Sequence, residues 1–441
     1  MIGCLFLCYF IALYSGLSIP LDSVMTTAEI NLFKQKALHW ASRFDVCCLL
    51  DSNGFTDKYS AYDFLLAADV NESLHLNCDN AFEELAEFYN LHRNWTFGLL
   101  TYDLKNELEP LNSANPDGLQ FPKLFFFVPK YLIAVRGASI TVLLGSKDIL
   151  DYIYHTTIPE SSIDNDVSIK SKMNRETYLA SIKEIQRHIS RGDVYELNYC
   201  QEFYAEHAQI DPVSVYQELT TISPSPFAGF LKMDKQFVLS ASPERFLCKR
   251  GQKLISQPIK GTSRRSQDPQ KDKMRKEALK ADKKEQAENV MIVDLVRNDL
   301  TKNAVPGTVQ VEELFGVYSF PQVHQMISTI SCQLRSDIHP VDAIKNVFPM
   351  GSMTGAPKIK AMQLIEVFEK SKRGAYSGTL GYIDPQGDFD FNVIIRSILY
   401  NAEAAYLSFQ VGSAITYAAD PEMEYEECLL KASGILKTLQ K

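Results

Sequence analysis

One lysine in the middle of the chain has neighbours that favour chemistry. Lys260 stands in the string Gln257-Pro258-Ile259-Lys260-Gly261-Thr262-Ser263. Burial of its ammonium group would favour the neutral amine, which is a nucleophile. The glycine that follows has no Cβ atom and would let a substrate approach closely. The alternative is an ordinary surface lysine at a strand end, because lysine side chains are rarely buried. The string alone leaves both interpretations open.

A glutamate upstream is a candidate for an acid. Glu244 lies in Ser242-Pro243-Glu244-Arg245-Phe246, where the proline favours an extended turn that fixes the direction of the next side chain. A carboxyl group in a dry cleft has a raised pKa, so it can stay protonated near neutral pH and donate to a leaving hydroxyl group. The alternative is an ion pair with Arg245 or Lys249.

Three further carboxylates are candidates for a metal site. Glu288 lies on the apolar stripe of the helical segment 287–299 and therefore faces the core, where a carboxylate needs a cation. Glu424 and Glu427 are three residues apart in a helix that Asp420 caps, so they share one helical face and repel each other unless a cation compensates. Carboxylates of this kind suit Mg²⁺. For Glu424 and Glu427, the alternative is that both are solvated glutamates on the surface.

An arginine near the C-terminal end could bind an anionic group. The segment 376–397 predicts a hairpin, with Arg396 on the same strand face as Ile394. A guanidinium group beside an apolar wall suits bidentate binding of a carboxylate. A cross-strand ion pair with Asp388 or Asp390 is the alternative.

The loop 351–357 precedes a predicted helix with Pro357 in its first position. Free backbone N–H groups at such a helix start face whatever lies in front of them. Binding of a substrate carboxylate and shaping of a cavity wall are both compatible with this pattern. The spacing of a nucleotide-binding Gly-x4-Gly-Lys-Ser/Thr loop is absent from the sequence, so ATP is not expected.

Together these strings resemble the chorismate-utilising enzymes, a family that includes anthranilate, aminodeoxychorismate, isochorismate and salicylate synthases. The resemblance rests on the Lys260 string and on residues 242–246, 287–299, 351–358 and 424–427. A lysine in Pro-Ile-Lys-Gly-Thr is similar to component I of aminodeoxychorismate synthase, since anthranilate synthases carry alanine there. Anthranilate synthase component I is the alternative within the family. A catalytically silent ligand-binding subunit that has kept the fold is the alternative from another class.

The resemblance implies an α/β (α+β) fold with two packed antiparallel sheets flanked by helices. It implies that chorismate reacts with ammonia: Lys260 attacks C2, Glu244 protonates the departing C4 hydroxyl group, and ammonia adds at C4. The implied Mg²⁺ ligands are Glu288 and Glu427, with Glu424 nearby, and the implied substrate-binding residues are Arg396, Gly261, Thr262, Thr354, Tyr376 and Gly412. A separate glutaminase subunit is the expected ammonia source, because no cysteine lies in a Gly-x-Cys-x-Gly string.

Two positions depart from the family pattern. Glu196 stands where isochorismate synthases place a lysine that activates water and where ammonia-using members usually carry glutamine. The missing lysine argues against hydration chemistry, while the role of the glutamate stays open; a surface charge on an edge strand is one interpretation. Gln325 replaces the histidine of anthranilate synthases, and His324 lies one position earlier. This shift is more similar to aminodeoxychorismate synthases.

Composition indicates an ordinary globular protein, with 46% hydrophobic and 22% charged residues. The formal net charge of −9 argues against a nucleic-acid partner, so an anionic substrate must be met by local cations, a metal ion or helix N-termini. Nine scattered cysteines without a Cys-x-x-Cys pair predict reduced thiols and a cytoplasmic location.

We expect two regions: 1–160, of the anthranilate synthase component I type, and 170–441, the chorismate-binding catalytic domain. Residues 2–20 are almost wholly apolar but lack the positive start of a secretory signal, so 1–24 are interpreted as a leader or a start-site artefact. No membrane attachment is expected. Periodicity predicts helices at 31–44, 80–91 and 178–189 and strands at 46–50, 95–102, 124–144, 194–203, 227–233, 236–240, 308–312 and 406–416. The charged segment 267–284 predicts a solvated loop that runs into a helix face.

Overall fold

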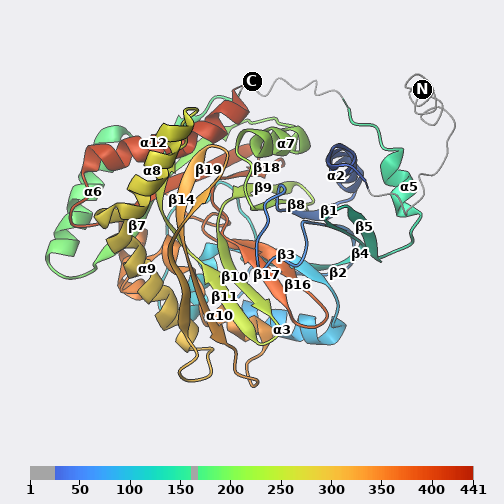
Figure 1. Cartoon of the computed structure of the whole chain (residues 1–441), viewed down its shortest axis with the longest axis horizontal. Helices are drawn as coiled ribbons and strands as arrows, with labels where there is room; N and C mark the ends of the chain where they lie inside the picture. The colour runs from blue at the N-terminus through green and yellow to red at the C-terminus, as the bar shows by residue number, and fades with distance from the viewer. Residues whose placement is uncertain (1–24, 160–166, 441) are drawn as a thin grey trace.

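The computed structural model describes residues 25–159 and 167–440, so the expectations for residues 1–24 lie outside the described residues (Figure 1). The helices are α2 (Thr27–Ala41), α3 (Ala81–His92), α4 (Lys105–Leu108), α5 (Ile149–Tyr154), α6 (Arg175–Ser190), α7 (Pro212–Ile222), α8 (Pro269–Ala281), α9 (Lys283–Thr301), α10 (Pro340–Lys345), α11 (Lys358–Phe368) and α12 (Pro421–Leu439). Two short 3-10 helices are η1 (Tyr102–Leu104) and η2 (Gly351–Met353).

The strands are distributed among these helices along the described chain, several of them in consecutive runs. They are β1 (Val46–Asp51), β2 (Phe64–Leu76), β3 (Thr96–Leu100), β4 (Leu124–Arg136), β5 (Ser139–Leu144), β6 (Lys170–Ser171), β7 (Glu196–Glu206), β8 (Phe227–Met233), β9 (Gln236–Ser242), β10 (Arg245–Arg250), β11 (Lys253–Gln257), β12 (Ile259–Arg264), β13 (Gln310–Ser319), β14 (Val323–Gln333), β15 (Gly355–Ala356), β16 (Thr379–Ile383), β17 (Phe389–Asn392), β18 (Ser397–Asn401) and β19 (Tyr406–Ile415). The predicted strands from 46 to 50, 227 to 233 and 406 to 416 are confirmed.

Side-chain caps fix where the predicted helices begin. Asn174 and Asp420 accept hydrogen bonds from backbone N–H groups in the first turns of α6 and α12, which confirms both helices. The charged segment 267–284, predicted as a solvated loop that runs into a helix face, is helical from Pro269 to Ala281, because Asp268 caps α8 there. Of the side chains of α8, only Leu279 is buried, and this polar composition hid the helix in the sequence.

Every strand pairing among the described residues is antiparallel. One half of the sheet runs in the order β7, β19, β18, β9, β8, with β6 and β15 also paired to β7. The other half runs β3, β16, β17, β10, β11, β14, with β12 and β13 also paired to β14. Strands β1, β2 and β4 link β8 to β3. The expected two packed sheets are thus two halves of one continuous network.

The two halves pack face to face. Leu231 of β8 and Phe391 of β17 belong to the same buried apolar cluster. A Cβ atom on Gly229 of β8 would lie 2.7 Å from a methyl carbon of Leu380 in β16, so the layers meet closely there. A second cluster lies between the first half and helices α2, α6, α7 and α12 (Figure 1). This arrangement confirms the expected fold class of antiparallel sheets flanked by helices.

Strand β7 departs from the alternating pattern expected of it. Its residues from 196 to 203 are all buried, because Leu197 belongs to one core cluster and Cys200 to the other. A strand covered on both faces has no solvent side and loses the alternation of polar and apolar residues. Glu196, interpreted as a possible surface charge, is therefore 1% exposed, and that interpretation is wrong.

The expected boundary between the two regions stays a prediction, because residues 160–166 lie outside the described residues. Strands of the N-terminal region pair directly with strands of the C-terminal region, β1 with β8 and β3 with β16. Within residues 25–159 and 167–440, no helix is both long enough and apolar enough to cross a membrane. The seven cysteines in this part of the chain are unpaired.

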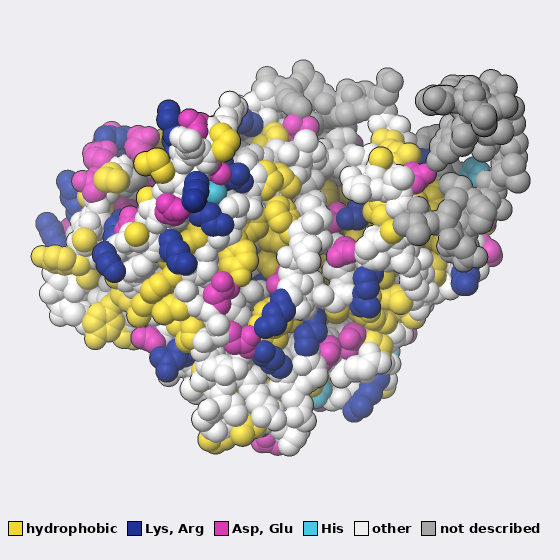
Figure 2. Space-filling model, viewed as in Figure 1, with side chains coloured by type: hydrophobic (Ala, Val, Ile, Leu, Met, Phe, Trp, Pro, Cys, Tyr) yellow, Lys and Arg dark blue, Asp and Glu magenta, His cyan; other side chains and the backbone are white. Residues whose placement is uncertain are grey.

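Charged side chains of both signs are interspersed on the face of the molecule seen in Figure 2. A mixed surface produces no strong field of one sign over this face. An anionic substrate must therefore be recognised by individual cationic groups inside a site, as the net charge of −9 also requires.

Candidate active site

Lys260 lies at an irregularity in strand β12. The register of β12 against β14 shifts between Ile259 and Thr262, and Gly261 within this shift has a φ of +92°. A side chain at this glycine would be strained, so the Lys-Gly pair is what permits the bend. The lysine side chain is only 12% exposed, and its Nζ atom lies 4.0 Å from Oε1 of Glu196. The surface interpretation of Lys260 is wrong.

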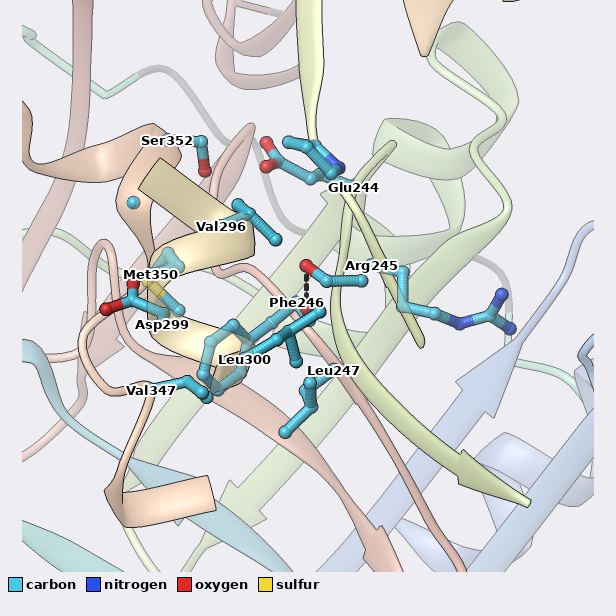
Figure 3. Close-up of a pocket in the computed structure, with 13 residues that line it drawn as sticks. Glu244, Arg245, Phe246, Leu247, Val296, Asp299, Leu300, Val347, Met350 and Ser352 are labelled. Carbon is cyan, nitrogen blue, oxygen red and sulfur yellow. Dashed lines mark hydrogen bonds between the residues drawn. The ribbon is translucent and has the colours of Figure 1, made fainter. Parts of the chain in front are cut away.

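Glu244 is buried in the turn between β9 and β10. Burial raises the pKa of this carboxyl to about 7, although the hydroxyl group of Ser352 and the charge of Lys260 act in the opposite direction. Figure 3 shows the Glu244 carboxyl group directed toward Ser352 at one end of a cavity of about 20 Å³. The carboxyl group is therefore a proton donor close to neutral pH, next to an amine.

The ion-pair alternatives for Glu244 are not found. Arg245 points away from the cavity, as Figure 3 shows, and its guanidinium group pairs with Asp57 and Asp390. Lys249 pairs with Asp388 at 2.8 Å. Neither cation is left for Glu244, so its carboxyl group is free to act as an acid.

Glu288 faces the lysine from helix α9. Its side chain is 14% exposed, as the apolar stripe predicts. Burial raises its pKa to about 7; Glu285 and Glu196 add to this effect, while Lys260 and Lys284 oppose it. Glu288 thus belongs to the same group of charges as Lys260 and Glu196.

The terminal helix α12 supplies two carboxylates. Glu424 is buried, and burial together with the charge of Glu427 raises its pKa. Glu427 is 49% exposed and pairs with Lys431 at 2.6 Å; burial would raise its pKa, but this lysine holds it below its usual value. The Nζ atom of Lys284 lies 3.9 Å from Oε1 of both Glu288 and Glu424. One lysine therefore serves as the shared cation of two expected metal ligands.

The acidic residues fit a magnesium ion by their chemistry. The described residues contain no group of three His, Cys, Asp or Glu side chains already close enough to hold a metal ion. Glu288 and Glu424 nevertheless converge on one point, where Lys284 now provides the positive charge. Carboxylate oxygens are the ligands that Mg²⁺ prefers, and this ion keeps several waters. The metal site stays a prediction, with Lys284 as a residue that the sequence analysis missed.

Arg396 lies between β17 and β18 rather than on a strand. Its φ of 53° breaks the strand, so the expectation that it shares a strand face with Ile394 is wrong. Burial lowers the pKa of its guanidinium group, which donates a 3.5 Å hydrogen bond to the carbonyl of Lys431. Asp388 and Asp390 pair with other cations instead. Among the described residues Arg396 has no carboxylate ion pair, which fits a site for a substrate carboxylate.

The other expected substrate-binding residues have different surroundings. The Thr354 hydroxyl group donates to the carbonyl of Gly351 at 3.1 Å, so it holds its own loop together. Tyr376 is buried, with its hydroxyl group 3.5 Å from Sγ of Cys200. At Gly412 a Cβ atom would lie 2.2 Å from the carbonyl oxygen of Tyr199. Thr262 is exposed, beside Gly261. Contact of these five residues with substrate stays a prediction.

Neighbouring motif residues have structural partners. His324 is 1% exposed, with Nε2 3.1 Å from Oδ1 of Asp272 and Nδ1 3.0 Å from Oγ of Ser319. Helix α11 begins at Lys358, so Pro357 is its capping residue and not its first helical residue as predicted. Ser352 and Lys284 were missed because their contacts with Glu244 and Glu424 join residues far apart in the chain, although the spacing of four residues between Lys284 and Glu288 is a local signal.

The chain belongs to the chorismate binding enzyme family, which matches residues 47–437. Aminodeoxychorismate synthase component 1 of Escherichia coli K12 is 34% identical over 349 residues, which are 78% of this chain and 76% of that protein. The protein of the same name from Salmonella typhimurium is 38% identical over 348 residues, with the same coverage of 78% and 76%. Anthranilate synthase component 1 of Thermus thermophilus is 32% identical over 359 residues, covering 78% and 77%.

Solved structures share the fold. The crystal structure of anthranilate synthase component I from Streptococcus pneumoniae has a TM-score of 0.74 at 24% identity, over 86% of this chain and 93% of that chain. The isochorismate synthase MenF from Escherichia coli has a TM-score of 0.73 at 17% identity, over 96% and 94%. At these identities the similarity shows a shared fold, and the reaction has to be inferred from the residues of the site.

Proposed function

We propose that this chain converts chorismate and ammonia to 4-amino-4-deoxychorismate, the aminodeoxychorismate synthase component I reaction, which leads toward p-aminobenzoate and folate. The observation that carries the proposal is the buried Lys260 close to Glu244, a carboxyl group that holds a proton near neutral pH. The names of the relatives that are 34% and 38% identical support it. A silent ligand-binding subunit would need neither an amine nucleophile nor an acid.

In the proposed reaction each buried group has one task. Arg396 binds a carboxylate of chorismate through its guanidinium group. The amine of Lys260 attacks C2, and Glu244 gives its proton to the C4 hydroxyl group, which leaves as water. Ammonia then adds at C4 as the bond between C2 and the lysine breaks. Two easier substitutions thus replace one difficult substitution.

Glu288, Glu424 and Glu427 would hold Mg²⁺ in this proposal. When bound, the ion would anchor and polarise the ring carboxylate of chorismate. Burial, with a smaller contribution from neighbouring carboxylates, raises the pKa values of Glu288 and Glu424, and this supports the role because a bound cation would stabilise their charged forms.

A separate glutaminase subunit is proposed as the source of ammonia. The designation component 1 in the names of two relatives supports a second component for those proteins. We also place the reaction in the cytoplasm, as the scattered cysteines of the sequence suggest.

The test is to mix the purified chain with chorismate, magnesium chloride and an ammonium salt, and to separate the products by liquid chromatography with mass detection. Aminodeoxychorismate that disappears on addition of a chelator is the expected product. Anthranilate with pyruvate would instead assign the chain to the anthranilate synthases, whose Thermus thermophilus member is 32% identical. Untouched chorismate, with ammonium and with an added glutaminase component, would reject both activities.

Replacing Lys284 by methionine is expected to tighten the binding of Mg²⁺ by up to about thirtyfold. The lysine competes with the ion for Glu288 and Glu424, and two partly exposed ion pairs contribute up to about 1 kcal/mol each. Isothermal titration calorimetry with magnesium chloride measures the affinity. Lys283→Met is the matched control, because Lys283 donates to Gln286 and belongs to neither of these two ion pairs. Weaker binding in Lys284→Met would show that the lysine supports the site.

A further inference from the structure

Glu196 is held by backbone contacts on both sides of its strand. Its backbone pairs with Ala356 of β15, and the N–H group of Tyr195 donates to the carbonyl of Ala356 at 2.7 Å. On the other side, Leu197 pairs with Ile415 of β19. With a side chain that is 1% exposed, Glu196 cannot turn toward solvent without breaking the sheet.

The carboxylate of Glu196 has fewer partners than its burial demands. Oε1 lies 4.0 Å from the lysine ammonium of Lys260, and Oε2 has no hydrogen-bond partner in the described part of the chain. An unsatisfied buried acceptor costs about 1–3 kcal/mol. Glu369 shows the contrast: equally enclosed, it accepts from Arg373 with both oxygens and from the N–H group of Cys200. At Glu196 the unpaired carboxylate lies beside the amine of the proposed nucleophile.

Charged groups from several elements surround the pair. Lys260 comes from β12, while Glu288 and Glu285 face it from α9, Glu427 from α12 and Glu244 from the turn before β10. Among the described residues, Glu196 is the only carboxylate within ion-pair distance of Lys260. A buried acid and amine with few hydrogen bonds lose less solvation as a neutral pair than as an ion pair. The ion pair of the hydrated, open site would therefore give way to the neutral pair when a bound substrate excludes water.

We propose that Glu196 is the proton acceptor that converts Lys260 into its nucleophilic form when chorismate fills the site. This inference rests on the proposed function. The proton passes from Nζ of Lys260 to the carboxylate of Glu196, directly or through one water. The separation of 4.0 Å is longer than a hydrogen bond, and a small movement of the lysine side chain would close the difference.

The proton and electron balance closes over one turnover. The neutral amine gives its electron pair to C2 while the C4–O bond breaks, and the Glu244 proton makes the leaving group water. Ammonia gives its pair to C4, and the C2–N bond breaks with its pair returning to Lys260. The new C4 ammonium group gives one proton to Glu244, and Glu196 returns its proton to Lys260. Chorismate and ammonia are thus converted to aminodeoxychorismate and water.

Glu196→Gln tests the proposal through the pH profile. Its kcat at neutral pH is expected to fall about 10²-fold, the usual contribution of a general base, with little change in KM for chorismate. The ratio of its kcat to the wild-type kcat should rise with pH, because hydroxide and buffer then deprotonate Lys260. Glu202→Gln is the control on the same strand: Glu202 is buried but accepts from Ser408 and Tyr406 outside the site. A kcat loss that is equal at every pH, or no loss, would overturn the proposal.

A measurement on Lys260 itself separates this inference from the proposed reaction. Acetic anhydride labels neutral amines, and peptide mass spectrometry reports the labelling of Lys260 against pH without any substrate. In Glu196→Gln the labelling should move to lower pH, since no adjacent carboxylate holds the ammonium form, whereas Glu202→Gln should match the wild type. Unchanged labelling would reject the interaction between Glu196 and Lys260. Shifted labelling in a protein that makes no aminodeoxychorismate would keep the pair and reject the proposed function.

Discussion

Replacing Lys260 by alanine is expected to reduce the turnover of chorismate at least about 10³-fold, because the covalent route through C2 loses its nucleophile. Arg396 and the acidic groups that would hold Mg²⁺ remain, so the dissociation constant for chorismate should change little. Steady-state product analysis measures the first quantity and calorimetric titration the second. Wild-type protein quenched during turnover should also carry a chorismate-derived mass on the peptide that contains Lys260.

Lys260→Arg is the matched control for this experiment. The alanine variant leaves Glu196 buried without its cation, which can destabilise the fold by about 3–5 kcal/mol. Arginine keeps a cation beside Glu196 but is not a nucleophile, so this variant should be folded and equally slow. Full turnover in either variant would contradict the covalent mechanism and leave Lys260 with an electrostatic role.

The sequence could predict the individual parts of the site but not the contacts among them. Local rules identified the cap Asp420, the inward face of Glu288 and the shared helical face of Glu424 and Glu427, because each depends on residues within one or two helical turns. These elements are confirmed as helices. Their common orientation toward Lys260 follows from strand order, which is set by pairings far apart in the chain.

The expectations that failed did so because long-range packing overrides a local pattern. Arg396 was assigned to a strand face from the apolar residues around it, whereas its positive φ ends the strand. Glu196 was read as a possible surface charge because strand alternation assumes a solvent face, which β7 lacks. The charged residues of α8 predict a solvated loop that runs into a helix face, and they hide where the helix begins because only Leu279 among its side chains is buried. Sequence periodicity records burial only where one face stays exposed.

Replacing Glu244 by glutamine is expected to lower kcat by about 10²-fold to 10⁴-fold, since the amide cannot protonate the departing hydroxyl group. Burial raises the pKa of the Glu244 carboxyl to about 7, so the wild-type kcat should fall as the pH rises through about 7 and the acid loses its proton. This alkaline decrease should be absent from the variant. Glu244→Asp, which keeps an acid on a shorter side chain, should retain the decrease at reduced activity. A variant with wild-type kcat, or with the same alkaline decrease, would exclude Glu244 as the acid.

The same carboxyl group makes folding stability depend on pH, which tests its burial without any assay of activity. The pKa is about 7 in the folded chain against 4.5 in the unfolded chain, so the folded state binds more protons between these values. The free energy of unfolding therefore falls as the pH rises from about 4.5 to about 7, by on the order of 3 kcal/mol from this group. Glu244→Gln removes this contribution, so its stability relative to the wild type should increase over the same interval. Urea unfolding at several pH values measures the difference, and a difference that does not vary with pH would mean that the Glu244 carboxyl group is solvated in the folded protein.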